Sequence, residues 1–285
     1  MATTLIVSPH LDDAALSIGG SIAAWLAAGE RVVVASVYTT GPPLAEIAPS
    51  MRPFANYARR REEDQGACGV LGAELRWLDQ VERAFRKPYL TNRAYFRTPE
   101  ERAGFDTLPA VTAAIAAVGD ELAPDRIVVP FGIGNHVDHV EALLAATDWA
   151  LAANLGDRLW FYEDFYALSR TMRRRHPIAR TRVWRSWESP LLHARRLGVI
   201  LRAISLAARG PTAMQLLAPP LRDARWTLAS SAIREHEHRK LAAIACYRSQ
   251  TRAFGGLAGI SRALRAYHAW WGGAEPLWRA SFREE

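Results

Sequence analysis

The chain has 285 residues, 49% of them hydrophobic, and a formal net charge of +7 from 36 basic and 29 acidic residues. This composition suits one large α/β domain, with or without a small C-terminal addition. The positive charge fits a solvated arginine surface, or attraction to acidic substrates or lipid headgroups. Because the sequence contains no nucleic-acid-binding motif, we expect no nucleic-acid partner.

Cysteine content and hydropathy indicate the cellular setting. With only Cys68 and Cys246, the chain has neither a disulfide framework nor a cysteine zinc cluster, so we expect a cytoplasmic protein. The N-terminus lacks the basic and apolar segments of a signal peptide. Charges interrupt every apolar run before the roughly 18–20 residues that a spanning helix needs, which predicts no integral membrane segment.

Strands and helices are predicted to alternate over the first 165 residues. In chain order, the expected elements are a strand at 4–8, a helix at 12–28, a strand at 31–39, a helix at 57–72, a strand at 74–78, a helix at 105–122, a strand at 126–130, a helix at 140–154 and a strand at 158–165. The strands are continuous apolar runs, typical of strands buried on both faces. This pattern predicts a Rossmann-like α/β fold, a mostly parallel sheet with helices on both faces.

The pattern changes after about residue 168. The elements expected there are a basic break at 170–175, a strand at 182–187, an arginine-dotted apolar helix at 191–209, a long helix at 231–249 and an aromatic, glycine-rich tail at 267–282. We therefore expect a Rossmann-like catalytic core at 1–168 that holds a metal site. Residues 169–285 form a C-terminal α+β extension of the same globular unit and shape the substrate pocket.

Two short polar segments follow the first and fourth predicted strands, at residues 8–13 (SPHLDD) and 135–139 (NHVDH). The carboxyl ends of parallel strands lie at one edge of the sheet, so the two segments are expected to converge. His10, Asp13 and His139 then form a ligand set for a hydrolytic zinc, which needs three protein ligands and one open position. Each segment alone is also typical of a helix cap or a structural histidine pair; their shared position favours the metal site.

Three further side chains of these segments are candidates for acid–base work. Asp12 lies at a helix N-terminus, where the helix dipole favours its ionised form, and this suits a general base. His136 precedes His139 by three residues and can face a substrate oxygen if a helix begins at residue 137. Asp138 is expected to accept a hydrogen bond from His136 and to fix its orientation.

These residues resemble a known family, the LmbE-like/PIG-L zinc deacetylases. The resemblance covers roughly residues 4–165, and a late YRSQ segment at 247–250 is similar to one that many members carry. The motifs that carry it are SPHLDD at 8–13, Arg60, Glu63 and Leu71-Gly72 of the second helix, Asp79 after the third strand, and HVDH at 136–139.

The resemblance implies hydrolysis of an N-acetyl group, usually on an N-acetylglucosamine-type amino sugar within a small conjugate. It implies zinc on His10, Asp13 and His139, and Asp12 as the general base. It also implies that His136 stabilises the oxyanion or protonates the leaving amine. Arg60 and Asp79 correspond to positions that contact the sugar in some members.

The sequence departs from the family pattern at three positions. Leu11 replaces the usual proline, Ala14 replaces the usual glutamate, and Gly134 stands where some members have a tyrosine that polarises the carbonyl. Either a side chain from the C-terminal part replaces that tyrosine, or His136 acts alone. These departures keep two alternatives open: a Rossmann-like glycoconjugate-binding or metal-holding protein without catalysis, and an amidohydrolase for another amide. The oligomeric state is not predicted.

Other features have mainly structural interpretations. Gly19-Gly20 lacks the spacing of a dinucleotide-binding fingerprint and indicates close helix–sheet packing instead. The ten tryptophans, several in the C-terminal half, favour core or interface packing over stacking on a sugar ring or an apolar aglycone. The 191–209 segment is expected to be a core helix with surface arginines, the alternative being a helix on a membrane surface.

Overall fold

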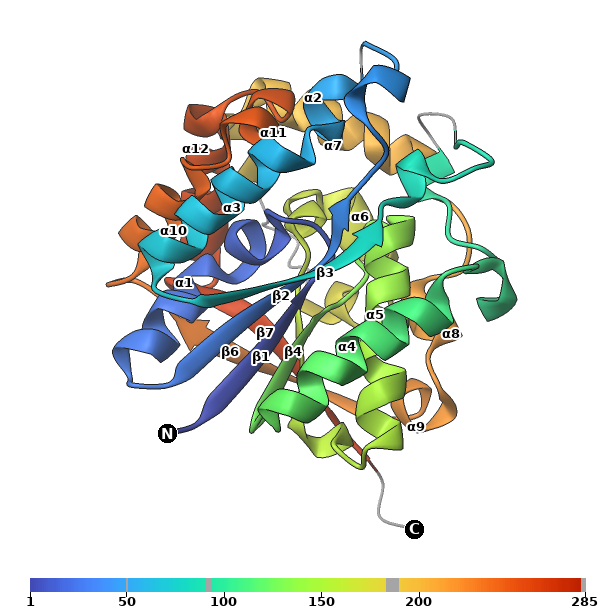
Figure 1. The fold of residues 1–285 in the computed structure, drawn as a ribbon. Coiled ribbons are helices and arrows are strands. Elements are labelled where there is room, and N and C mark those ends of the chain that lie inside the picture. The colour runs from blue at the N-terminus through green and yellow to red at the C-terminus, as the bar shows by residue number, and fades with distance from the viewer. Residues whose placement is uncertain (50, 91–93, 183–189, 283–285) are drawn as a thin grey trace.

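The computed structural model describes residues 1–49, 51–90, 94–182 and 190–282. Its centre is a seven-stranded sheet in the order β3-β2-β1-β4-β5-β7-β6 (Figure 1). The strands are β1 (Thr3–Ser8), β2 (Arg31–Thr40), β3 (Glu74–Val81), β4 (Arg126–Pro130), β5 (Leu159–Tyr162), β6 (Arg225–Ala232) and β7 (Ala274–Ser281). The first five strands are parallel, and β7 pairs antiparallel with both β5 and β6. The mostly parallel sheet is therefore confirmed.

Helices cover both faces of the sheet, as predicted. They are α1 (Asp13–Ala27), α2 (Arg52–Ala55), α3 (Tyr57–Leu71), α4 (Leu108–Leu122), α5 (Val137–Ala152), α6 (Arg170–Arg175), α7 (Arg195–Ala207), α8 (Ala213–Leu216), α9 (Pro219–Arg222), α10 (Glu237–Ile244), α11 (Arg248–Ala253) and α12 (Leu257–Trp270). In Figure 1, α1, α3 and α10 lie on one side of the sheet, and α4 and α5 lie on the other.

Alternating side chains of the parallel strands supply these two cores. Leu5 and Val33 belong to the cluster that contains α4 and α5, whereas their neighbours Ile6 and Val34 belong to the cluster with α1 and α3. All four side chains are buried. Because both faces are buried, these strands read as continuous apolar runs in the sequence.

The C-terminal part corrects two expectations. The helix predicted at 231–249 is wrong: β6 extends to Ala232, and α10 and α11 follow as separate short helices. Only Ser231 and Ala232 of the predicted helix belong to β6, where they pair with Glu275 and Ala274 of β7 and are therefore extended. The helix predicted at 191–209 is present as the shorter α7. The strand predicted at 182–187 falls on residues 183–187, outside the described residues.

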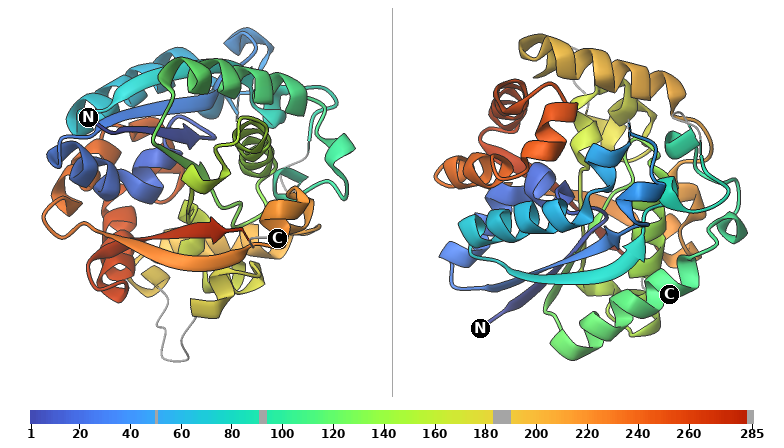
Figure 2. Two further views of the ribbon diagram at one scale, coloured as in Figure 1. Left: turned by 90° about the horizontal axis from the view of Figure 1, so that it is seen from below. Right: turned by 45° about the horizontal axis from the view of Figure 1, so that its top comes forward.

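The C-terminal residues extend the same sheet, as Figure 2 shows for β6 and β7. Trp226 and Trp278 pack on Phe131 with ring-centroid distances of 5.2 and 5.9 Å, which agrees with the core packing expected for tryptophans. Trp184 and Trp187 are not among the described residues.

None of the helices in the described ranges is both long and apolar enough to span a bilayer. Cys68 and Cys246 are free thiols. The cytoplasmic location expected from the cysteine content stays a prediction.

Candidate active site

The two polar segments meet at the point where the strand order reverses. β1 lies between β2 and β4, so the loop after β1 and the loop after β4 leave the sheet side by side and diverge toward opposite faces. Such a switch point forms a crevice at the carboxyl end of a parallel sheet. His10 follows β1, Asp13 begins α1, and His139 lies in the first turn of α5.

Three side-chain atoms converge in this crevice. Nδ1 of His10 lies 2.9 Å from Oδ2 of Asp13, and Nε2 of His139 lies 3.2 Å from the same oxygen. Nε2 of His139 is buried, and apart from this ion-pair contact with Asp13 it has no hydrogen-bond partner among the described residues. Two imidazole nitrogens and one carboxylate oxygen match the ligands of a catalytic zinc. The predicted set of His10, Asp13 and His139 is thus brought together and can hold a metal ion.

A second carboxylate contacts the far nitrogen of each histidine. Nε2 of His10 lies 3.2 Å from Oδ2 of Asp138, and Nδ1 of His139 lies 2.6 Å from Oδ1 of Asp164. Asp164 also accepts a hydrogen bond from the backbone N–H of Ile133 at 2.8 Å. Such carboxylates fix the tautomer and the ring orientation of a metal-binding histidine.

This arrangement corrects the role expected of Asp138. The predicted hydrogen bond from His136 to Asp138 is wrong, because Asp138 pairs with His10 and accepts from the N–H of Arg83 at 3.1 Å. Residues two apart at the start of a helix point in different directions. Asp164 was missed entirely; its signal was an acidic residue at the carboxyl end of the fifth strand.

Charges within the cluster compensate one another. Burial lowers the pKa of His139, but Asp13 and Asp164 outweigh burial and raise it to about 9. Burial raises the pKa of Asp13, but His139 and His10 hold it well below its usual value. The carboxylates of the cluster therefore favour positive charge at its centre. Protons on the imidazole rings supply this charge, and a divalent cation supplies it instead when it binds and the ring nitrogens release those protons.

A cavity of about 130 Å³ opens beside His10 and Asp13, and both Asp12 and His136 also line it. The side chain of Asp12 does not cap α1, so its carboxylate is available to a ligand. Burial and the charge of Asp13 raise the pKa of Asp12 to about 6. Burial and the neighbouring histidines lower the pKa of His136 to about 3, so its imidazole is neutral. Nδ1 of His136 is buried and has no partner among the described residues.

Aromatic rings orient His136. Its imidazole lies parallel to the ring of Tyr166, with 6.2 Å between centroids and 6° between planes, and Phe96 packs edge-on at 5.1 Å. Gly134 has φ of +99°, and a Cβ added there would lie 2.9 Å from Cβ of Tyr166. The missing side chain at position 134 therefore leaves room for Tyr166, which lines the cavity.

The other two departures from the family pattern point away from the ligands. Leu11 is buried in a cluster with Tyr57 and Phe85, and Ala14 is buried in the core between α1 and the sheet. Neither side chain lines the cavity.

The two predicted substrate contacts differ in position. Arg60 lines the cavity, is 4% exposed and pairs with Glu82, while its Nε has no hydrogen-bond partner among the described residues. Asp79 is not among the lining residues; its side chain is 66% exposed and pairs with Arg61. The register between β2 and β3 shifts between Trp77 and Gln80, and Asp79 within this irregularity adopts φ of +56°.

The late YRSQ segment joins the C-terminal part to α3. The hydroxyl of Tyr247 donates to Asp64 at 2.7 Å, and the hydroxyl of Ser249 donates to Glu63 at 2.5 Å. The next residue, Gln250, lines the cavity. The C-terminal part thus contributes directly to this site.

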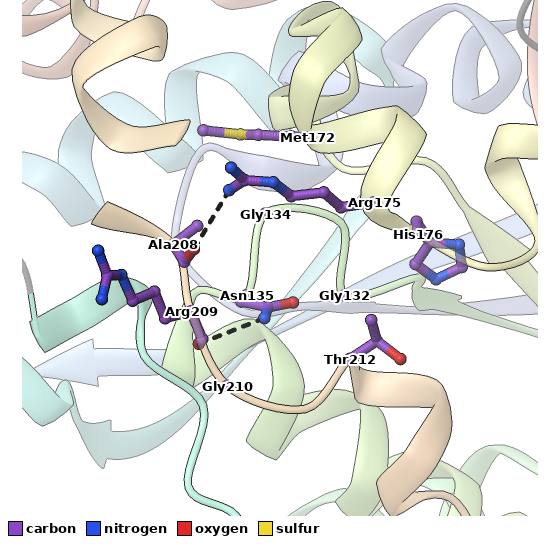
Figure 3. Close-up of a pocket in the computed structure, with 10 residues that line it drawn as sticks. All are labelled: Gly132, Gly134, Asn135, Met172, Arg175, His176, Ala208, Arg209, Gly210 and Thr212. Atoms are coloured by element: carbon purple, nitrogen blue, oxygen red, sulfur yellow. Dashed lines mark hydrogen bonds between the residues drawn. The ribbon is translucent and has the colours of Figure 1, made fainter. Parts of the chain in front are cut away.

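A second cavity, of about 200 Å³, lies behind the loop that presents His136 (Figure 3). The side chains of Asn135 and Arg175 donate to backbone carbonyls of the 205–211 segment. Both ring nitrogens of His176 also contact backbone groups. These three polar side chains are occupied by contacts within the protein, so we assign this cavity no ligand.

The fold and the site define an α/β protein with a crevice in which His10, Asp13 and His139 can hold a metal ion. The chain belongs to the PIG-L family, whose model, described as GlcNAc-PI de-N-acetylase, matches residues 5–150. This confirms the resemblance found in the sequence.

Similar proteins are deacetylases. The 2'-N-acetylparomamine deacetylase of Streptomyces fradiae is 32% identical over 166 residues, which are 56% of this chain and 56% of that enzyme. The match thus spans about half the length of the curated relative. A deacetylase triple mutant of the teicoplanin biosynthetic pathway has a TM-score of 0.71 at 20% identity and covers 100% of both chains. The A40926 pseudoaglycone deacetylase has a TM-score of 0.64 at 21% identity and covers 99% of this chain and 98% of that chain. At these identities, the solved structures establish the fold alone.

Proposed function

We propose that this protein is a zinc-dependent hydrolase that removes the N-acetyl group from an N-acetylglucosamine-type amino sugar in a small glycoconjugate or biosynthetic intermediate. The observation that carries the proposal is the convergence of His10, Asp13 and His139 beside a cavity that Asp12 and His136 line. The family model and the deacetylases similar to this chain support the choice of reaction.

His10, Asp13 and His139 hold the metal ion, with Asp138 and Asp164 fixing the two rings. When bound there, zinc supplies Lewis acidity toward the acetamide carbonyl and lowers the pKa of water. Asp12 accepts the proton of the attacking water; its raised pKa of about 6 suits a base that must later release that proton near neutral pH.

The water oxygen attacks the acetyl carbon, and negative charge develops on the carbonyl oxygen. The neutral imidazole of His136 donates a hydrogen bond to that oxygen, and we assign the Tyr166 hydroxyl as a second donor from the same wall. The C–N bond then breaks as the amine nitrogen takes the proton held by Asp12, which leaves acetic acid and the free amine; at neutral pH the acid passes its proton to the amine, so that acetate and the ammonium ion are released.

The cavity wall suits a sugar. Arg60 and Glu82 place charged groups at one side, and Phe54, Phe165 and Phe254 contribute aromatic rings. Charged groups hydrogen-bond to sugar hydroxyls, and aromatic faces pack on the apolar face of the ring. We propose that residues 169–285 complete this pocket within the same globular unit, through Gln250 and Phe254.

The test combines metal analysis with acetate release from a panel of N-acetyl amino sugars. Purified protein is expected to bind one zinc per chain and to lose activity with chelator. His10→Ala is expected to lose both metal and activity, whereas Asp12→Asn is expected to keep the metal and lose at least 100-fold in kcat. Surface variant Glu46→Gln serves as the control. Acetate release that persists in metal-free protein would contradict the proposal, and a zinc protein that binds sugars without releasing acetate would favour the non-catalytic alternative.

A further inference from the structure

The helix that carries Asp13 is broken shortly after it begins. Ile18, in the second turn of α1, has φ of −130° and ψ of 23°, which is not helical. In a regular helix, the N–H of Ser21 would donate to the carbonyl of Ser17. A break at Ile18 separates these backbone N–H and carbonyl groups. Because buried backbone groups need hydrogen-bond partners, other groups must replace the lost ones.

A buried ion pair from the C-terminal part supplies those partners. Nζ of Lys240 donates to the carbonyl of Ser17 at 3.0 Å, and Oε2 of Glu275 accepts from the N–H of Ser21 at 2.7 Å. Glu275 also accepts from the N–H of Gly20 at 3.2 Å and from the Ser21 hydroxyl at 2.6 Å. Lys240 and Glu275 bind each other at 2.6 Å, and both side chains are 0% exposed.

Two glycines allow the C-terminal part to approach α1 closely. A Cβ on Gly19 would lie 3.0 Å from Cγ of Lys240, and a Cβ on Gly20 would lie 2.9 Å from the side chain of Ile233. Close packing was predicted for Gly19-Gly20, but these partners are α10 and the segment after β6 rather than the body of the sheet. In Figure 1, α10 lies alongside α1.

The first segment of α1 is therefore held at both ends. At its start, the hydroxyl of Ser8 in β1 accepts from the N–H of Ala14 at 3.1 Å and donates to the carbonyl of His10 at 2.6 Å. At its end, Lys240 holds the carbonyl of Ser17. Between these anchors lies Asp13, and Asp12 precedes it.

We propose that Lys240 and Glu275 are positioning residues for the metal site. By occupying the break in α1, they prevent its two segments from joining into one regular helix, and so set the direction of the first turn. This direction aims Asp13 at His10 and His139 and aims Asp12 into the cavity. The effect on metal affinity rests on the metal site of the proposed function, and the effect on catalysis rests on its deacetylase activity as well.

The test separates positioning from general stability. Lys240→Met alone removes the lysine partner of the buried Glu275 carboxylate and is expected to destabilise the fold strongly. The double variant Lys240→Met/Glu275→Gln removes both charges and is expected to regain much of that stability. Its zinc affinity, measured on folded protein by competition with a chelator, is expected to remain at least tenfold below that of the unsubstituted protein.

Leu201→Ala provides the matched control, because Leu201 is 0% exposed and lies in α7. This variant is expected to lose stability through a cavity but to keep its zinc affinity within twofold. If the double variant does not fold, the single variant Glu275→Gln replaces it, because glutamine keeps the shape of the side chain. The zinc affinity of Glu275→Gln is then compared with that of Leu201→Ala under conditions in which the two variants are equally stable. Zinc affinity in the Glu275 variants equal to that of Leu201→Ala would overturn the proposal. If the unsubstituted protein binds zinc but releases no acetate, the proposed function fails and this comparison still decides the positioning role.

Discussion

Asp164 receives the Nδ1 hydrogen of His139 at 2.6 Å, and its other oxygen accepts from the backbone N–H of Ile133 at 2.8 Å. These contacts turn Nε2 of His139 toward Asp13, where it has no other partner. A side chain at the end of β5 thus determines which nitrogen of a helix residue faces the metal position.

Replacing Asp164 by asparagine is expected to weaken zinc binding by about 10–100-fold, since loss of such a contact disturbs the ring orientation and the basicity of the ligand. Competition with a chelator at fixed pH measures the change. Asp120→Asn is the control, because this carboxylate in α4 accepts a hydrogen bond from Nε1 of Trp149 and does not line the cavity. Equal zinc affinity in both variants would show that Asp164 does not orient His139.

Tyr166→Phe is expected to lower kcat about 100-fold, as removal of one oxyanion donor typically does, with little change in KM or in zinc content. Tyr162→Phe is the matched control, because the Tyr162 hydroxyl donates to the backbone of Val7 away from the cavity. Steady-state kinetics with the best substrate of the panel decides the matter. If Tyr166→Phe retains full kcat, His136 acts without the phenol.

Substitutions of Arg60 and Asp79 are expected to have different effects on kcat/KM. Asp79 is largely exposed and lies outside the cavity, so Asp79→Ala should leave kcat/KM within twofold. Arg60→Gln removes a buried charge from the cavity wall and should lower kcat/KM by more than tenfold. A tenfold rise in KM for Asp79→Ala would instead support the sugar contact that the family resemblance implies.

Acid should destabilise the fold through His176. Burial lowers the pKa of His176 to about 4, and its ring nitrogens contact the carbonyl of Phe131 and the N–H of Ala179. As the pH falls below about 6.5, the unfolded chain binds a proton that the folded chain does not, so stability decreases until about pH 4. The full effect is roughly 3 kcal/mol.

This dependence is measured as the difference in Tm between pH 7.5 and 4.5, with chelator present in all samples. His176→Gln can make both backbone contacts without titrating, so its Tm should fall less than that of the unsubstituted protein. Identical falls in Tm would show that His176 does not contribute to acid sensitivity.

Local sequence patterns were sufficient for the parallel core. The apolar runs that became β1, β2 and β4 and the helices between them depend on near neighbours in the chain. The HLDD and HVDH segments were placed correctly because parallel strands bring their carboxyl ends to one edge. The sequence by itself therefore determined the fold class and the three candidate ligands.

Tertiary structure decided the partners of these residues. Asp138 contacts His10 rather than His136, Asp164 supports His139, Tyr166 fills the space beside Gly134, and Glu275 reaches Ser21 from 254 positions away in the chain. β6 and β7 were not predicted as strands, and each is paired along its length with the other, a partner more than 40 positions away in the chain. Such choices depend on which side chains packing brings within about 3 Å, and no spacing along the chain encodes that distance.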